Sequence, residues 1–103
     1  AQCEGTLVWG VAMALTDGLP VDDTGVAASS FADAPIPRWQ QVPALSVELV
    51  DSALPPTGAG ETGMVSVAAA IGNAIADATA YRVTRLPVNP SLLLQHLSTR
   101  PAP

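Results

Sequence analysis

The sequence predicts an α+β fold with two main helices, a short antiparallel β region between them and a short C-terminal helix. Apolar residues recur at helical spacing over residues 4–15 and again over residues 64–81, which predicts the two main helices. The stretch between them is rich in turn-forming residues and holds two short segments with strand character. A length of 103 residues allows one domain with one modest hydrophobic core.

The first helix is expected to run from about Glu4 to Leu15. One stripe along it is apolar and the opposite face is apolar as well, which is typical of a helix buried on several sides. We expect it to end at residues 16–18, with Gly18 in the left-handed cap position and Pro20 shortly after. The expected stripe consists of Leu7, Val8, Val11, Ala12 and Leu15, and the opposite face of Trp9, Met13 and Ala14.

Two segments in the middle of the chain are the expected strands, Val26–Phe31 and Leu45–Asp51. In the second segment apolar and polar side chains alternate, which is the period of a half-buried strand. Residues 34–39 contain two prolines, which remove backbone donors from a sheet. We therefore expect an extended surface or channel-lining connection there.

The second helix is expected over Met64–Tyr81. Its many small residues suit the close approach of a neighbouring element, although Gly72 costs about 1 kcal/mol relative to alanine in a helix interior. Further on, Asn89 and Pro90 match an N-cap and a first-turn proline, which predicts a short helix through Leu97, with residues 99–103 frayed. The apolar positions that repeat along the second helix are Val67, Ile71, Ala74, Ile75 and Ala78.

The composition excludes several classes of function. Four Lys and Arg residues stand against nine Asp and Glu residues, a net charge of −5, so the chain has no basic surface for nucleic acid or an anionic membrane. The longest apolar runs are too short to span a bilayer. A single cysteine, Cys3, permits no internal disulfide, and together with the lone His96 it forms no metal-ligand cluster.

A glycine-rich turn with one carboxylate precedes the second helix, at Gly58-Ala59-Gly60-Glu61-Thr62-Gly63. Glycines let a ligand approach the backbone closely, and the first N–H groups of a helix favour an anion. We therefore expect Glu61 to be an ionised carboxylate available as a base. An ordinary loop-to-helix junction and an anion-binding turn are alternatives, although the latter lacks the Lys-Ser/Thr of a phosphate-binding loop.

The order of motifs along the chain resembles the C-terminal end of molybdenum hydroxylase large subunits, the xanthine dehydrogenase and aldehyde oxidase superfamily. The glycine-rich turn, the small-residue run 69–79 and Arg82-Val83-Thr84-Arg85-Leu86-Pro87 carry this resemblance. Upstream, it extends to Gln2-Cys3-Glu4-Gly5, to Ser30-Phe31-Ala32-Asp33 and to the segment 43–50 that precedes the turn. Among subfamilies, the chain most resembles the isoquinoline 1-oxidoreductase β-subunit type.

This resemblance implies that residues 1–103 are a C-terminal fragment of a molybdopterin-binding domain, inactive alone and part of a larger α+β domain. It implies a molybdopterin cofactor, in the cytosine dinucleotide form, that binds the metal without protein side chains. Glu61 takes the role of the catalytic base, and Gln2 and Gly60 those of cofactor-binding residues. The implied reaction inserts water-derived oxygen into an aldehyde or an N-heterocycle. The implied partners are the remainder of the large subunit and an iron–sulfur small subunit.

Two positions depart from the family pattern. Thr62 stands where many members have Pro or Gln, which bears on the shape of the turn, and Ala80 stands where they have Gly, so the second helix is expected to run on to Tyr81. From a different class of function, the alternative is a small non-enzymatic α+β interaction module whose apolar helices bind a protein partner.

Overall fold

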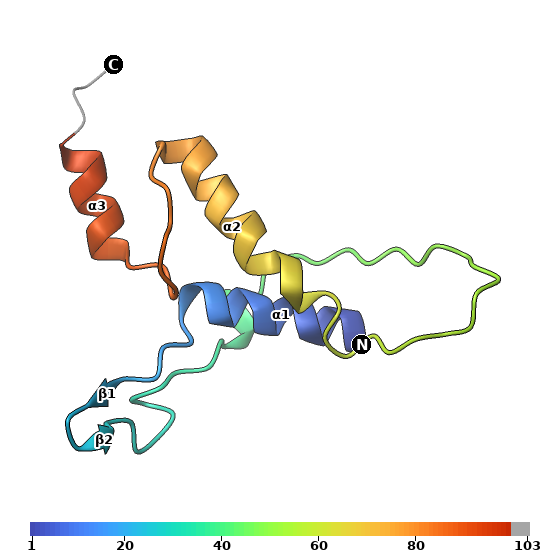
Figure 1. Cartoon of the computed structure of the whole chain (residues 1–103), viewed down its shortest axis with the longest axis horizontal. Coiled ribbons are helices and arrows are strands. Elements are labelled where there is room, and N and C mark those ends of the chain that lie inside the picture. The colour runs from blue at the N-terminus through green and yellow to red at the C-terminus, as the bar shows by residue number, and fades with distance from the viewer. Residues whose placement is uncertain (100–103) are drawn as a thin grey trace.

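Three α-helices, one two-stranded hairpin and a single 3₁₀ turn are the regular structure of residues 1–99, the part of the chain that this computed structural model describes (Figure 1). The hairpin lies between the two long helices in sequence, so the predicted α+β class is confirmed. The elements are α1 (Gln2–Leu15), β1 (Val21–Asp22), β2 (Gly25–Val26), η1 (Trp39–Gln41), α2 (Met64–Thr79) and α3 (Pro90–Ser98).

The β region is smaller than the sequence predicts and lies elsewhere. β1 and β2 pair antiparallel, with Val21 opposite Val26, and Gly25, the first residue of β2, adopts a positive φ of 120° directly after the tight turn. The expected strand over residues 26–31 is wrong beyond Val26, and the expected strand over residues 45–51 is wrong entirely. Alternation specifies which side chains share a face, but a strand forms only where another strand supplies the hydrogen bonds.

The connection after the hairpin is ordered by one carboxylate. Asp33 Oδ2 accepts hydrogen bonds from the backbone N–H of Ser29 at 3.1 Å and from the hydroxyls of Ser29 and Ser30, each at 3.0 Å. The Ser29 N–H, followed by the two hydroxyls, holds the pKa of Asp33 below its usual value. Residues 34–38 that follow are not a strand, as the two prolines predict, and Trp39 begins η1 with its side chain 86% exposed.

The core lies where α1 crosses α2, and small residues form it. Gly10 and Ala14 are buried on α1, and they face α2 and the segment before α3. A Cβ atom added at Gly10 would lie 2.7 Å from Val67 Cβ, so the absence of a side chain is what lets the helices approach this closely. The expected stripe is therefore only partly right, because Ala12 is buried but Leu15 is 44% exposed.

The expected burial of α1 on several sides is wrong within the described residues. Trp9 and Met13, which were assigned to the second apolar face, are 52% and 40% exposed. Only Ala14 of that face is buried, because its backbone carbonyl accepts the N–H of Val88 at 2.8 Å and draws the segment before α3 against α1.

The cap expected for α1 and the end expected for α2 both differ in the structure. α1 ends at Leu15, as expected, but its C-cap is Thr16, whose φ is −136°, and Gly18 does not take the left-handed conformation; a Cβ there would lie 3.1 Å from Pro87 Cγ. α2 ends at Thr79 rather than Tyr81, because Ala80 adopts the left-handed conformation with φ 58° and stops the helix. The predicted N-cap of α3 is confirmed, since Asn89 Oδ1 accepts the N–H groups of Ser91 and Leu92.

His96 joins α3 to the end of α2. Its Nε2 lies 3.2 Å from the carbonyl oxygen of Thr79, and its ring centroid lies 5.2 Å from that of Tyr81. The His96 side chain therefore contacts the C-terminal end of α2. Residues 99–103 are expected to fray, but only Thr99 of this stretch lies within the described residues.

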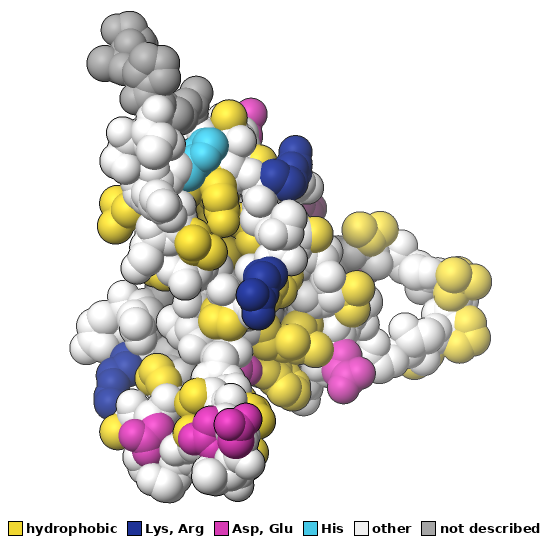
Figure 2. All heavy atoms as spheres, turned by 60° about the vertical axis from the view of Figure 1, so that its left-hand side comes forward, with side chains coloured by type: hydrophobic (Ala, Val, Ile, Leu, Met, Phe, Trp, Pro, Cys, Tyr) yellow, Lys and Arg dark blue, Asp and Glu magenta, His cyan; other side chains and the backbone are white. Residues whose placement is uncertain are grey.

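The molecule is open in outline. Its radius of gyration is 17.0 Å, against about 13 Å for a compact domain of 100 residues. Residues 42–59 contain no helix or strand, and Figure 1 shows them as a long arm that leaves the helices and returns at the start of α2. Figure 2 shows hydrophobic side chains spread over one face above an acidic end, and the hairpin contributes Asp22 and Asp23.

Candidate functional site

The glycine-rich turn ends directly at the start of α2. Gly63 is the N-cap of the helix, and the carbonyl oxygen of Glu61 accepts the N–H of Met64 at 3.1 Å. Thr62 Oγ1 donates to the carbonyl oxygen of Gly58 at 3.2 Å, which closes the turn on itself. Within residues 1–99 the Glu61 carboxylate is exposed and makes no side-chain hydrogen bond or ion pair. It is therefore available to a ligand beside the turn.

The crossing of the helices brings the first turn of α1 to this glycine-rich turn. A Cβ atom added at Gly60 would lie 3.9 Å from Gln2 Oε1, although the two residues lie far apart in the chain. They line a shallow cavity of about 310 Å³. The Gln2 side chain has no hydrogen-bond partner among the described residues, so its amide can bind a ligand. The cavity is lined by Ala1, Gln2, Gly5, Thr6, Trp9 and Gly60.

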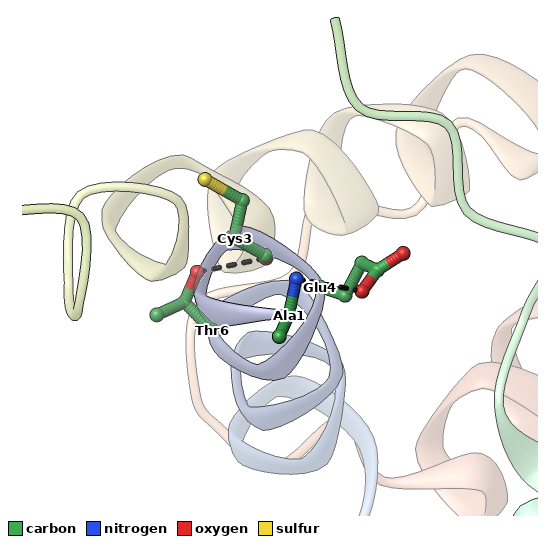
Figure 3. A network of polar contacts seen from close by, with 4 residues as sticks. All are labelled: Ala1, Cys3, Glu4 and Thr6. Atoms are coloured by element: carbon green, nitrogen blue, oxygen red, sulfur yellow. Dashed lines mark hydrogen bonds and ion pairs between the residues drawn. The ribbon is translucent and has the colours of Figure 1, made fainter. Parts of the chain in front are cut away.

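The first turn of α1 is held by two polar contacts (Figure 3). The amino group of Ala1 lies 3.0 Å from Glu4 Oε2 in an exposed ion pair, a kind of contact that stabilises little. Thr6 Oγ1 donates to the carbonyl oxygen of Cys3 at 2.9 Å, and Thr6 is only 4% exposed. Thr6 therefore presents its side chain to the neighbouring helix in one fixed orientation.

A larger cavity lies away from this turn. It measures about 540 Å³ and is bounded by Leu15 and residues 81–92. Its lining side chains include Arg85 and Tyr81 but no carboxylate, histidine or cysteine. It therefore offers no general base near neutral pH. The lining of the smaller cavity has no such side chain either, but it includes Gly60, which directly precedes Glu61 in the chain.

The sequence-predicted site residues are brought together in part. Gln2 and Gly60 lie side by side, and Glu61 follows Gly60 in the chain without lining the same cavity. Sequence reasoning missed Thr6 and Gly63, which lie between Gln2 and the body of α2. Their spacing in the sequence gives no signal, because a contact between two helices depends on how they cross.

Residues 1–99 contain neither a cluster of metal-binding side chains nor a helix that could span a membrane. No group of three or more histidine, cysteine, aspartate or glutamate side chains is placed to hold a metal ion. None of the helices has the length and apolar character needed to cross a lipid bilayer.

Over most of its length the chain is similar to several characterised proteins. It is 35% identical over 92 residues to the isoquinoline 1-oxidoreductase subunit beta of Brevundimonas diminuta, covering 89% of this chain and 12% of that protein. It is 35% identical over 103 residues to a membrane-bound aldehyde dehydrogenase (pyrroloquinoline-quinone) of Gluconacetobacter polyoxogenes, covering 94% of this chain and 12% of that protein. No family model matches the chain.

A further relative is the aldehyde oxidoreductase molybdenum-binding subunit PaoC of Escherichia coli K12, 31% identical over 107 residues, covering 94% of this chain and 14% of that protein. Over most of its length the chain is thus homologous to large subunits of the molybdenum hydroxylases, a family of oxidoreductases, and the resemblance read from its motifs is confirmed. The chain spans only 12% to 14% of the length of these relatives.

Proposed function

We propose that this chain is a C-terminal part of the molybdopterin-binding domain of a hydroxylase large subunit, and that it contributes the catalytic base and one edge of the cofactor pocket. The observation that carries the proposal is the meeting of Gln2 with Gly60 immediately before Glu61. Three residues singled out from the sequence for two different roles thereby lie at one place on the molecule. The homology to molybdenum-dependent oxidoreductases supports the same function.

The residues fit a large polar cofactor. Gly60 has no side chain, and Gln2 Oε1 is the nearest atom to the position that its Cβ would take. The cleft between them is therefore bounded by backbone on one side and by a primary amide on the other. An amide offers both donors and an acceptor, which suits the pterin and phosphate groups of a molybdopterin, here in the cytosine dinucleotide form.

The role of Glu61 follows from its position. When bound, the cofactor would supply the oxygen atom and accept the two electrons that the substrate releases. A carboxylate oxygen of Glu61 would take the proton that must leave this oxygen, and a general base needs to lie within hydrogen-bond reach of that proton. In support of this role, the Glu61 carboxylate is exposed just before α2 and unpaired within residues 1–99, so it is free to bond a ligand without breaking any contact of the fold.

The substrate class and partners follow from the relatives. Isoquinoline 1-oxidoreductase and aldehyde oxidoreductase are named for an N-heterocycle and an aldehyde, so we propose an electron-poor carbon of one of these classes as the site of oxidation. The relatives are named as subunits, so the proposed partners are the rest of the large subunit and an iron–sulfur small subunit that passes electrons on. The interaction-module alternative is not favoured, because the relatives are oxidoreductases.

The proposal is tested by Glu61→Gln in the full-length protein that contains this chain. The amide keeps the shape of the side chain but cannot take a proton, so kcat should fall by about 10²- to 10⁴-fold while molybdenum content stays at the wild-type level. Glu48→Gln is the matched control, since Glu48 is an exposed carboxylate in the arm, and it should keep full activity.

Activity of the Glu61→Gln protein within about threefold of wild type would contradict the role of the base. Metal analysis of the wild-type protein separates the two cofactors found in the names of the relatives, molybdenum in PaoC and pyrroloquinoline quinone in the aldehyde dehydrogenase. A purified active protein without molybdenum would overturn the cofactor assignment.

A further inference from the structure

Three contacts between α1 and the start of α2 follow one another along the two elements. Gln2 faces Gly60, Thr6 faces Gly63, and Gly10 faces Val67. On α1 the three residues are spaced by four, so they lie on one face of the helix, one turn apart. In each contact one partner is a glycine, and the side chain opposite lies against its backbone.

The middle contact involves Gly63, which lies two residues after Glu61. A Cβ atom added at Gly63 would lie 2.7 Å from Thr6 Oγ1, far inside the roughly 3.5–4.0 Å at which non-bonded atoms attract. Thr6 is buried, and its hydroxyl is bonded to the carbonyl oxygen of Cys3. A methyl group at position 63 would therefore have to break that bond or push the turn away from α1.

Backbone conformation does not require a glycine at position 63. Its φ and ψ are −69° and −32°, in the right-handed helical region that alanine adopts readily. The contact with Thr6 is therefore the reason that a side chain at position 63 would force the turn or Thr6 to shift. Gly58, in the same turn, differs, because a Cβ at that position would meet no atom within 4 Å.

We propose that Thr6 and Gly63 are positioning residues, which together set the placement of Glu61 relative to Gln2. Gln2 lies one turn before Thr6 on α1, and Glu61 lies two residues before Gly63. Beside the meeting of Gln2 with Gly60, the Thr6–Gly63 contact is thus a second structural link between the residue proposed to hold the cofactor and the residue proposed to take the proton. The inference rests on the proposed function, and it adds that packing at this one point determines the catalytic geometry.

Gly63→Ala in the full-length protein tests this. The substitution should displace the turn by about 1 Å, and a shift of that size at a reacting group lowers kcat by about 10- to 100-fold. Molybdenum content should stay at the wild-type level. The double substitution Thr6→Ala/Gly63→Ala removes the hydroxyl that the new methyl group meets, so it should restore most of the lost activity. Such rescue indicates direct coupling between two neighbouring sites.

Gly72→Ala is the matched control. It makes the same chemical change within α2, but the new Cβ would lie 3.8 Å from Val83 Cβ, an ordinary contact, so kcat should not change. If Gly63→Ala does not yield a folded protein, the double variant must fold and be active. Full activity of Gly63→Ala, or failure of Thr6→Ala to rescue it, would overturn the proposal.

Hydrogen exchange measures the same coupling without activity. Amides of residues 58–64 should exchange at least about tenfold faster in Gly63→Ala and return to the wild-type rate in the double variant, because a displaced turn opens more often. Unchanged exchange in all variants would refute the positioning role even if Glu61 is the base. A different outcome is that exchange is altered and rescued as expected but Glu61→Gln keeps its activity. That result would refute the role of Glu61 and support the Thr6–Gly63 contact.

Discussion

The chemistry assigned to Gln2 depends on a single exposed amide. Its side chain is oriented toward Gly60 by its place in the first turn of α1, and it makes no hydrogen bond within the described residues. An exposed amide contributes most to the binding free energy when the ligand atom that it bonds becomes buried on binding. Removal of the amide then leaves that buried atom without a hydrogen-bond partner.

We predict that Gln2→Ala in the full-length protein weakens cofactor retention more than it slows the reaction. Loss of one hydrogen bond to a buried polar group costs about 1–3 kcal/mol. Molybdenum and pterin occupancy should therefore fall during extended dialysis, while kcat per bound molybdenum stays near wild type. Gln40→Ala, at an exposed glutamine in η1, is the control. Equal occupancy of wild-type and Gln2→Ala proteins after dialysis would mean that Gln2 does not contact the cofactor.

At the scale of the element, α2 is fixed at its two ends by different means. Its start is set by the Thr6–Gly63 contact, and its end by the left-handed conformation of Ala80, with φ 58°. For a residue with a Cβ atom this conformation costs roughly 1–2 kcal/mol, a cost that glycine avoids. His96 adds a contact to the carbonyl oxygen of Thr79, the last residue of the helix.

We predict that Ala80→Gly stabilises the end of α2 by about 1 kcal/mol, because it removes the strain of the left-handed residue. The amides of Ala80 and Tyr81 should then exchange about fivefold more slowly, since local opening becomes less frequent. Ala78→Gly, within the same helix, should have the opposite effect, because glycine lowers helix stability by about 1 kcal/mol. Faster exchange in Ala80→Gly would show that Ala80 is not strained.

At the scale of the whole molecule, little apolar surface is covered. Among the described residues no large side chain is fully buried, and Phe31, Leu49, Val50 and Trp39 are between 75% and 90% exposed. The radius of gyration of 17.0 Å agrees with an open arrangement. Exposed apolar surface on this scale is typical of a face that contacts another part of a protein.

We predict that residues 1–103 expressed alone self-associate or form a loosely packed state. A chain of this length covers a smaller share of its surface than a large domain, and here the apolar arm and helix faces add to what is exposed. Sedimentation should show association, a hydrophobic dye should bind, and molybdenum should not be retained. A monomer with a sharp thermal transition and no dye binding would identify the chain as a self-sufficient domain.

The helices and the α3 cap at Asn89 could be predicted from the sequence, and Glu61 could be proposed as a base from it, because each depends on residues near one another in the chain. Periodicity locates a helix, and an Asn-Pro pair or a Gly-x-Gly-Glu turn is local. The sequence could not predict which face of α1 is buried, that Gln2 meets Gly60, or that residues 45–51 lack a strand partner within residues 1–99. These outcomes depend on how helices cross and on whether a second strand is present. Small residues such as Gly10 and Thr6, which carry no hydrophobic signal, determine the crossing by allowing close approach.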